Sequence, residues 1–299
     1  QLKSEKKMKI IDCTSFYSEH MMYEVRLNIL DSKVDKFIVT ESTYSHSGQK
    51  KKLNFDINNY PKFKDKISYI VIDKEPIGIV PENNDPSLQR SNSLKRIALS
   101  YDESLKVLKN FSSNDFIMLS DNDEIPNLDS EYFLNNKSSI VLFNQLFIYF
   151  KFNLLYDKML WPGTKGCAME KLKSLSWLRN IKLKKYPFWR LDTLFSENKY
   201  IDLNVIQDGG WHFTNLKTPD EMYEKFMNFG HHDEFRLSGL TIEKIRDKIL
   251  NKEMFYDHLA DKSSTNKWES NYKLKVISDE MLPSYLIKNK KKYREWFSD

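Results

Sequence analysis

Residues 116–126 read FIMLSDNDEIP, and this stretch decides the fold that the sequence predicts. Its first four residues are apolar, which is typical of a buried strand. The carboxylates of Asp121, Asp123 and Glu124 follow, and Pro126 ends the segment. Alternate residues of an extended chain point to the same side, so we expect Asp121 and Asp123 to share one divalent cation. Oxygen ligands of this type suit Mg²⁺ or Mn²⁺, and such a cation helps a bound diphosphate to leave.

The other polar residues of this stretch have less certain roles. Glu124 could join the metal shell, act as a base or cap the next segment, because Asn127 and Asp129 resemble turn and cap residues. Asn122 lies between the two aspartates. We place it among the residues that contact a nucleotide-linked substrate.

Strand-like and helix-like stretches alternate through the first half of the chain. This alternation predicts an α/β fold with a mostly parallel sheet flanked by helices. The second half is less regular and predicts a helical C-terminal part. The expected strands are residues 9–13, 34–40, 67–72, 116–119 and 139–149, and the expected helices are 23–30, 91–108, 220–229 and 241–251.

Ligands of open α/β sheets bind beyond the C-terminal ends of the strands. Thr14, Glu41 and Ser42 follow two of the expected strands, and the acidic stretch follows a third. Three strand ends therefore converge on one crevice. We expect these three residues to line a nucleotide pocket there.

Two arginines have competing interpretations. Arg90 precedes the helix expected at residues 91–108, and its planar guanidinium could pair with a diphosphate. It could equally be a surface residue beside an ordinary N-cap at Ser91 or Asn92. Arg26 could form a structural ion pair with Glu19.

A glycine-rich turn, Gly209-Gly210-Trp211-His212, is the second candidate site. The glycines allow close backbone approach, and the imidazole of His212 can ligate a cation or hold a phosphate. The alternative is a buried histidine packed beside Trp211. Residues 231–233, His-His-Asp, favour a polar turn after a helix over a metal cluster, because adjacent side chains diverge.

Composition narrows the class of protein. The 299 residues are 40% hydrophobic and 14% aromatic, which supports a substantial core. No GxxxxGK[ST], GxGxxG or GxSxG pattern is present, so P-loop, kinase and hydrolase classes lack their usual marks. The net charge is +5, with lysine runs at residues 50–52 and 288–292. We expect no nucleic-acid partner, while a basic surface allows peripheral contact with an anionic membrane.

The compartment follows from the cysteines and the N-terminal segment. Cys13 and Cys167 are the only cysteines, and we expect both to be free thiols in a reducing compartment. No apolar run is long enough to span a bilayer, and the first residues lack the apolar core of a signal peptide. We expect a cytoplasmic protein, peripheral to a membrane at most, with Met8 as its natural start and residues 1–7 as a cloning remnant.

The order of these motifs resembles glycosyltransferase family 17, whose known eukaryotic members are β-1,4-mannosyl-glycoprotein β-1,4-N-acetylglucosaminyltransferases. The resemblance covers nearly the whole chain. The stretches that carry it are DCTSFYSE (12–19), EVRL (24–27), VDKFIVTES (34–42), QR (89–90), SDNDEIP (120–126), PGT (162–164), GC (166–167), GWH (210–212) and LPSYLIKN (282–289).

The resemblance implies a GT-A type, Rossmann-like fold, which we expect to be a single domain over residues 8–299. It also implies a UDP-sugar donor, UDP-GlcNAc by analogy, and inversion at the anomeric carbon. Asp121 and Asp123 occupy the family's metal motif, with His212 as a further candidate ligand for Mn²⁺ or Mg²⁺. Arg90 would stabilise the leaving UDP.

An inverting transfer needs a carboxylate that deprotonates the acceptor hydroxyl. The candidates are Glu124, Asp192 and Asp208, of which Asp208 lies beside the glycine-rich turn. The chain lacks the family's membrane anchor, so the acceptor could be an oligosaccharide, a glycolipid or a glycoprotein.

Two other functions remain open. The first is another metal-dependent nucleotide-sugar enzyme, namely a nucleotidyltransferase or a donor hydrolase, which would need no sugar acceptor. The second is a non-catalytic glycan-binding module, in which Trp161, Trp189 and Trp211 would stack on sugars. That module would show no metal-dependent nucleotide binding.

Overall fold

The structure is a computed structural model that describes residues 7–81, 85–184, 187, 189–193, 195–227, 235, 238–260, 268 and 270–299. The chain divides into two compact units. Unit 1 comprises residues 1–145 and 162–210, and unit 2 comprises residues 146–161 and 211–299. The expected single domain over residues 8–299 stays a prediction.

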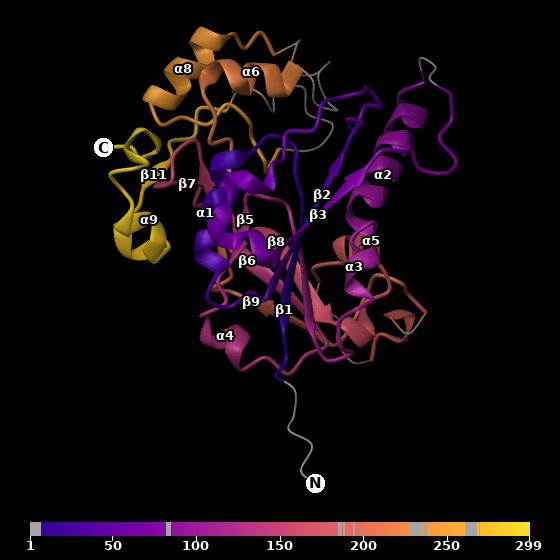
Figure 1. The fold of residues 1–299 in the computed structure, drawn as a ribbon. Helices are drawn as coiled ribbons and strands as arrows, with labels where there is room; N and C mark the ends of the chain where they lie inside the picture. Colours follow the sequence, from indigo (N-terminus) through magenta and orange to yellow (C-terminus); the bar gives the residue numbers. More distant parts are fainter. Residues whose placement is uncertain are drawn as a thin grey trace. The chain divides into compact units, whose positions relative to one another are not determined.

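Unit 1 carries most of the strands and its helices lie between them in the sequence (Figure 1). Its strands are β1 (Ile10–Ser15), β2 (Lys36–Ser42), β3 (Ile67–Ile72), β4 (Phe116–Ser120), β5 (Glu124–Pro126), the first part of β6 (Ile140–Tyr149), nearly all of β8 (Trp161–Ala168) and β9 (Leu203–Ile206). Its helices are α1 (His20–Leu30), α2 (Pro86–Asp102), α3 (Leu105–Leu108), α4 (Glu131–Leu134) and α5 (Leu175–Asn180).

The sheet of unit 1 is mostly parallel. Strands β3, β2, β1 and β4 lie side by side in that order and all run parallel, with Cys13 of β1 opposite Ile38 of β2 and Leu119 of β4. Strand β8 joins β4 in the antiparallel sense, and β9 runs parallel to β6. This order is that of a Rossmann-like half. The predicted α/β class, with a mostly parallel sheet, is confirmed.

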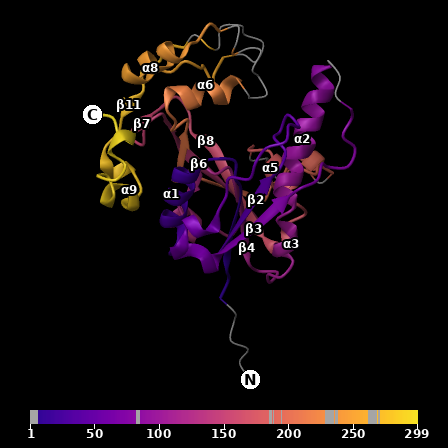
Figure 2. The ribbon, with the colours of Figure 1, turned by 45° about the horizontal axis from the view of Figure 1, so that its top comes forward.

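Helices cover both faces of this sheet. Figures 1 and 2 show α1 on one side of strands β1 to β3 and helices α2, α3 and α5 on the other. The central strands are buried along nearly their whole length, as expected for parallel strands covered on both faces. Cys13 and Cys167 belong to the core as free thiols. Burial raises the pKa of both, that of Cys167 to about 12.

Several elements of unit 1 differ from the sequence-based expectation, which did not include the short elements β5, β9, α4 and α5. The helix expected at residues 91–108 starts earlier, at Pro86, and is divided into α2 and α3. Asp85 is its N-cap, because the Asp85 carboxylate accepts a hydrogen bond from the N–H of Ser87 at 2.8 Å. Strand β8 was not anticipated, since its proline and two glycines are poor strand formers.

Unit 2 contains the helical C-terminal part that the sequence predicts. Its β10 (Gly210–Thr214, from Trp211 onward) runs parallel to the end of β6, and β7 (Leu154–Leu155) and β11 (Lys275–Val276) add short antiparallel pairs. Its helices are α6 (Pro219–Met227), α8 (Ile242–Leu250) and α9 (Ser284–Lys288). An aromatic core holds these elements together. No helix within the described ranges is both long and apolar enough to cross a bilayer.

Candidate active site

The acidic stretch after β4 forms a closed turn. The strand ends at Ser120, and Asn122 and Asp123 lie in the turn itself. The N–H of Glu124 donates to the carbonyl of Asp121 at 3.0 Å, and the Glu124 carboxylate accepts from the N–H of Asp121 at 3.0 Å. The expected alternation along an extended chain is therefore wrong at this point. Among its three expected roles, Glu124 comes nearest to that of a cap.

A buried arginine fastens this turn to β1. Arg26 of α1 pairs with Asp12 through two contacts, at 2.8 Å from Nε and 2.6 Å from Nη2. Its Nη1 donates to the carbonyls of Glu124 and, at 3.4 Å, Asp121. Burial acts to lower the pKa of Arg26, but Asp12 raises it above its ordinary value. The expected pair with Glu19 is wrong, since Arg26 has Asp12 as its partner.

Asp121 is held by two groups from the helical face. Arg179, in the last turn of α5, donates from Nη1 to Oδ1 at 3.1 Å and from Nη2 to Oδ2 at 2.9 Å. The hydroxyl of Tyr101, on α2, donates to Oδ1 at 2.7 Å. Partial burial acts to lower the pKa of Arg179, but Asp121 raises it above the ordinary range. Burial and Asp121 both raise the pKa of Tyr101.

The two residues at the tip of the turn differ in exposure. Asp123 is half-buried, whereas Asn122 is buried at 6% exposure. Neither amide atom of the Asn122 side chain has a hydrogen-bond partner among the described residues. An unpaired buried amide costs about 1–3 kcal/mol, so this turn holds a polar group that is not satisfied internally.

Two further basic residues, Lys165 and His46, lie near the Asp121–Arg179 pair. Half-burial and the nearby Arg179 lower the pKa of Lys165 to about 8. The Lys165 amine donates to the carbonyls of Arg179 and, at 2.9 Å, Ile181, and so fixes the end of α5. Desolvation lowers the pKa of His46, with Asp121 raising it and Arg179 lowering it. The site thus sets the Asp121 carboxylate against the cationic Arg179 guanidinium, with the Lys165 amine on the Arg179 carbonyl.

The three expected nucleotide-binding residues at strand ends do lie at the C-terminal edge. Thr14 stands opposite Ser120 in the β1–β4 register, directly before the turn. Ser42 ends β2 and accepts a hydrogen bond from the N–H of Tyr44 at 3.0 Å. Both lie where a nucleotide would bind in a Rossmann-like sheet.

Glu41 is engaged with its own chain. Its side chain is fully buried and forms an ion pair with Lys51 at 2.7 Å. It also accepts hydrogen bonds from the N–H groups of Asn54 and Phe55, at 2.8 and 3.0 Å, and from the hydroxyl of Tyr69 at 2.8 Å. These contacts show that Glu41 organises the loop after β2.

Arg90 lies within α2 and not before it, because the helix begins at Pro86. Its side chain is exposed. The expected N-cap at Ser91 or Asn92 is wrong. Asn92 is buried, and its amide side chain bonds the backbone N–H and carbonyl of Val80 at 3.1 and 2.8 Å.

The two other candidate bases differ in their surroundings. Asp208 is exposed and, among the described side chains, accepts a hydrogen bond from the amide of Asn127 at 2.9 Å. Asp192 forms ion pairs with Arg190 at 2.7 Å and with Lys199 at 3.2 Å. Hydrogen bonds from Arg190 and Lys199 lower the pKa of Asp192 far below its ordinary value. A carboxylate so stabilised is a poor proton acceptor.

The two glycines that follow Asp208 pack closely against neighbouring backbone, Gly209 against Asn144 and Gly210 against β5, the strand that follows the acidic turn. A Cβ at Gly209 would lie 2.4 Å from the carbonyl oxygen of Asn144, and one at Gly210 would lie 2.2 Å from that of Ile125. Gly210 also has a φ of +107°. The close backbone approach expected for the two glycines is confirmed.

His212 lies in unit 2, and so do its described ring contacts. Its ring stacks on Phe147 at a centroid distance of 5.1 Å and on Trp161 at 4.5 Å. The side chain is buried at 6% exposure. The expected neighbour Trp211 instead donates its indole N–H to the carbonyl of Met281 at 2.7 Å. Residues 231–233 lie outside the described residues.

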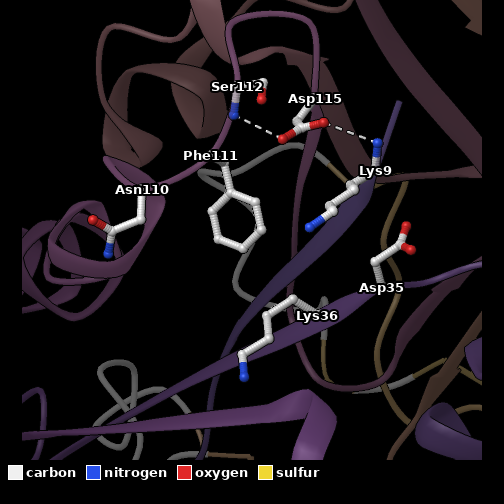
Figure 3. A pocket seen from close by; sticks show the side chains of 7 residues that line it. All are labelled: Lys9, Asp35, Lys36, Asn110, Phe111, Ser112 and Asp115. Carbon is white, nitrogen blue, oxygen red and sulfur yellow. Dashed lines mark hydrogen bonds between the residues drawn. The ribbon is translucent and has the colours of Figure 1, made fainter. Parts of the chain in front are cut away.

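A pocket lies at the opposite edge of the sheet from the acidic turn, at the N-terminal ends of the strands (Figure 3). Its lining residues precede or begin strands, as Lys9 does for β1 and Lys36 for β2. The Asp115 carboxylate accepts from the N–H groups of Lys9 and Ser112 at 2.9 and 2.8 Å. This carboxylate therefore ties the backbone together. Ligands of open parallel sheets bind at the other edge.

The two carboxylates of the turn suit a cation that binds together with the phosphates of a substrate. Among the residues described, no three His, Cys, Asp or Glu side chains gather to hold a metal unaided. Mg²⁺ is commonly held by one or two carboxylates together with substrate phosphates and water. Asp121 and Asp123 supply that number.

Several residues of the site were missed by sequence reasoning. Arg179 and Tyr101 come from separate helices and carry no local motif, so only the fold brings them to Asp121. Asp12 was identified only as part of a strand. An aspartate inside an apolar strand, with an arginine on the next helix, was a usable signal, because a buried charge needs a partner.

Comparison with known proteins finds a family model and several relatives that match this chain. The family model described as glycosyltransferase family 17 matches residues 1–297. The chain is 24% identical over 238 residues to the beta-1,4-mannosyl-glycoprotein 4-beta-N-acetylglucosaminyltransferases of Mus musculus and Homo sapiens. The match covers 74% of this chain but 42% and 43% of those proteins, so the chain spans less than half of their length.

Among solved structures, the inositol-1-phosphate CTP transferase from T. maritima is similar with a TM-score of 0.32 and 10% identity. The similarity covers 81% of this chain and 98% of that one. A likeness of this size carries no argument about function.

Proposed function

Since this chain belongs to glycosyltransferase family 17, we propose that it transfers GlcNAc from UDP-GlcNAc to a glycan hydroxyl, with inversion and with a divalent cation. The observation that carries the proposal is the closed turn Asp121–Glu124 at the C-terminal end of β4. It presents two carboxylates at the edge where nucleotides bind in such sheets. The names of the relatives in the mouse and human support GlcNAc as the sugar.

Asp121 and Asp123 would hold Mn²⁺ or Mg²⁺ together with the donor diphosphate. When bound, the cation supplies neutralisation of the charge that develops on the leaving UDP. The proposed metal site uses these two carboxylates, and the expected role of His212, which belongs to unit 2, stays a prediction. Arg26 and Glu124 contribute by fixing the turn, so the two carboxylates are positioned before the donor arrives.

The strand ends next to the turn would bind the nucleotide. Thr14, Ser42 and Asn122 offer hydroxyl and amide groups there. Glu41 would act by ordering the loop after β2. Arg90 lies exposed on α2, eleven residues before Tyr101, and its contact with the diphosphate stays a prediction.

The acceptor needs a base, and we assign this role to Asp208. Its carboxylate is exposed and accepts a hydrogen bond from Asn127, so it can take the proton of an acceptor hydroxyl. Glu124 is already committed to the backbone of the turn, and Asp192 is held by two cations. The acceptor would be an oligosaccharide, a glycolipid or a glycoprotein.

The test is a transfer assay with UDP-GlcNAc, Mn²⁺ and a panel of β-mannosyl and β-hexosyl acceptors, read by product mass and UDP release. We expect a product that gains one HexNAc, and no product with Asp121→Ala or Asp123→Ala. Metal-dependent UDP release without any glycosylated product would favour a donor hydrolase. Full activity in both variants would remove the turn from the mechanism.

A further inference from the structure

The ion pair between Asp121 and Arg179 occupies a carboxylate that the proposed function assigns to a metal. Resting on that function, we propose that Arg179 is a donor-binding residue that exchanges partners. Without donor, Arg179 pairs with Asp121. When the cation and the diphosphate bind, Asp121 would contact the cation from its present position and the Arg179 guanidinium would turn to the diphosphate.

The geometry of the pair suits an exchange. Each terminal nitrogen of Arg179 donates to a different oxygen of Asp121, Nη1 to Oδ1 at 3.1 Å and Nη2 to Oδ2 at 2.9 Å. This planar fork fits a diphosphate equally well, because both anions offer paired oxygens. The two side chains remain 40% and 35% exposed, so solvent and ligands can reach them.

The backbone of Arg179 is anchored while its side chain is accessible. Helix α5 starts at the N-cap Ser174, whose hydroxyl accepts from the N–H of Trp177 at 3.0 Å. Asp102 on α2 accepts from the N–H and hydroxyl of Ser176 at 2.8 and 2.6 Å. Lys165 binds the Arg179 carbonyl. An exchange therefore needs only side-chain rotation at the end of a fixed helix.

Tyr101 contacts both partners of the exchange, Asp121 through its hydroxyl and Arg179 through its ring. The Tyr101 hydroxyl donates to Asp121 Oδ1 at 2.7 Å from a side chain that is only 5% exposed. This contact can persist after Arg179 leaves, which keeps Asp121 oriented. The Arg179 guanidinium lies 5.2 Å from the centre of the Tyr101 ring, so it has a favourable surface along which to move.

Charge balance supplies the reason for the resting pair. Asp121 and Asp123 lie two residues apart in one turn, and two neighbouring carboxylates without a cation disfavour each other's charge. Arg179 neutralises one of them when no metal is present. The arriving cation makes that role unnecessary and the arriving diphosphate offers Arg179 a new anion.

The test is isothermal titration of purified protein, first with Mn²⁺ alone and then with UDP at saturating Mn²⁺. For Arg179→Ala we expect the affinities for Mn²⁺ and for UDP to change in opposite directions. The Mn²⁺ affinity without nucleotide should rise at least tenfold, because Asp121 has lost its competing cation. The UDP affinity should fall at least tenfold. Arg179→Lys, which keeps the charge but not the fork, should lie between wild type and Arg179→Ala in both titrations.

Arg190→Ala is the matched control. Arg190 pairs with Asp192 at 2.7 Å, and these side chains are 43% and 42% exposed, much as in the Arg179 pair. This variant should bind Mn²⁺ and UDP as the wild type does. If Arg179→Ala lowers both affinities together, or changes neither, the exchange is wrong.

The two proposals can fail separately. If wild-type protein does not bind UDP in the presence of Mn²⁺, the proposed function fails. The Mn²⁺ titration contains no nucleotide, so it still tests whether Arg179 competes for Asp121. If UDP binds with Mn²⁺ and Arg179→Ala binds both ligands as wild type does, only the exchange fails.

Discussion

The Nη1 atom of Arg26 donates a hydrogen bond to the main-chain carbonyl of Glu124. The same guanidinium forms a two-point ion pair with Asp12 of β1, and all these groups are buried. One side chain thereby joins a helix, a strand and the turn that carries the candidate metal ligands. The stability of unit 1 and the shape of its site depend on the same contact.

Arg26→Ala should therefore destabilise the protein severely. The change leaves the buried Asp12 carboxylate without its cation, and breaking a buried pair on one side costs about 3–5 kcal/mol. The free energy of unfolding, from urea titration followed by circular dichroism, measures this loss. Arg190→Ala removes an exposed pair and should cost less than about 1 kcal/mol. Equal stabilities of the two variants would contradict the assigned role of Arg26.

Glu41→Gln should lower stability in a pH-dependent way. Burial acts to raise the pKa of Glu41, but hydrogen bonds from Lys51, Asn54, Phe55 and Tyr69 bring it below its ordinary value of 4.5. A lowered pKa means that the ionised carboxylate adds stability above about pH 4.5 and that this contribution is lost as pH falls through the folded-state pKa.

The unfolding free energies of wild type and Glu41→Gln should thus differ by about 1–3 kcal/mol near neutral pH. The difference should shrink steadily in acid. Urea titrations at several pH values give this profile. A gap that stays constant or widens on acidification would show that the Glu41 contacts do not stabilise its ionised form.

Gly210→Ala should disturb both stability and transfer. The added Cβ would meet the backbone of β5 and of Asn127, at 2.2 Å from the Ile125 carbonyl and 2.6 Å from the Asn127 nitrogen, at a φ of +107°. We expect a loss of roughly 2–4 kcal/mol and a weaker UDP affinity, since β5 follows the acidic turn directly.

Gly239→Ala is the control for backbone strain alone. Gly239 has a φ of +65°, and no atom of the residues that the structure describes lies within 4 Å of an added Cβ. This variant should lose only about 1–2 kcal/mol. Thermal unfolding of both variants separates the two costs, and equal losses would show that the close approach at Gly210 is unimportant.

Asp208→Asn should reduce turnover without preventing donor binding. A missing general base lowers kcat by about 10²–10⁴-fold. The UDP affinity should remain close to that of wild type, because Asp208 does not contact the donor in the proposed site. Asp192→Asn should retain kcat. The steady-state rate of UDP-GlcNAc consumption checks both, and the reverse pattern would transfer the role of base to Asp192.

The sequence predicts the framework of unit 1 well, because its strands are continuous apolar runs that end in polar residues. β1, β2, β3, β4 and β6 are found within a few residues of the expected ranges. Strand β8 was missed because Pro162, Gly163 and Gly166 conceal it. It is specified by antiparallel pairing with β4, a long-range contact that no local pattern contains.

The candidate site was predictable only in part, for the same reason. Asp121 and Asp123 follow a buried strand, so their position at the sheet edge can be read locally. Their arrangement in a closed turn depends on the Glu124 carboxylate and on Arg26. The partnership of Asp121 with Arg179 spans 58 residues and follows from the packing of α5 near the end of β4.

The most direct measurement is calorimetric titration of UDP-GlcNAc into wild type and Asp123→Asn, each with Mn²⁺ and with EDTA. The account predicts that the wild type binds UDP-GlcNAc with Mn²⁺ and not with EDTA. In Asp123→Asn the affinity should fall about 100-fold while the thermal stability is retained. Equal binding by both proteins, or binding that persists in EDTA, would contradict a metal-dependent donor site at this turn.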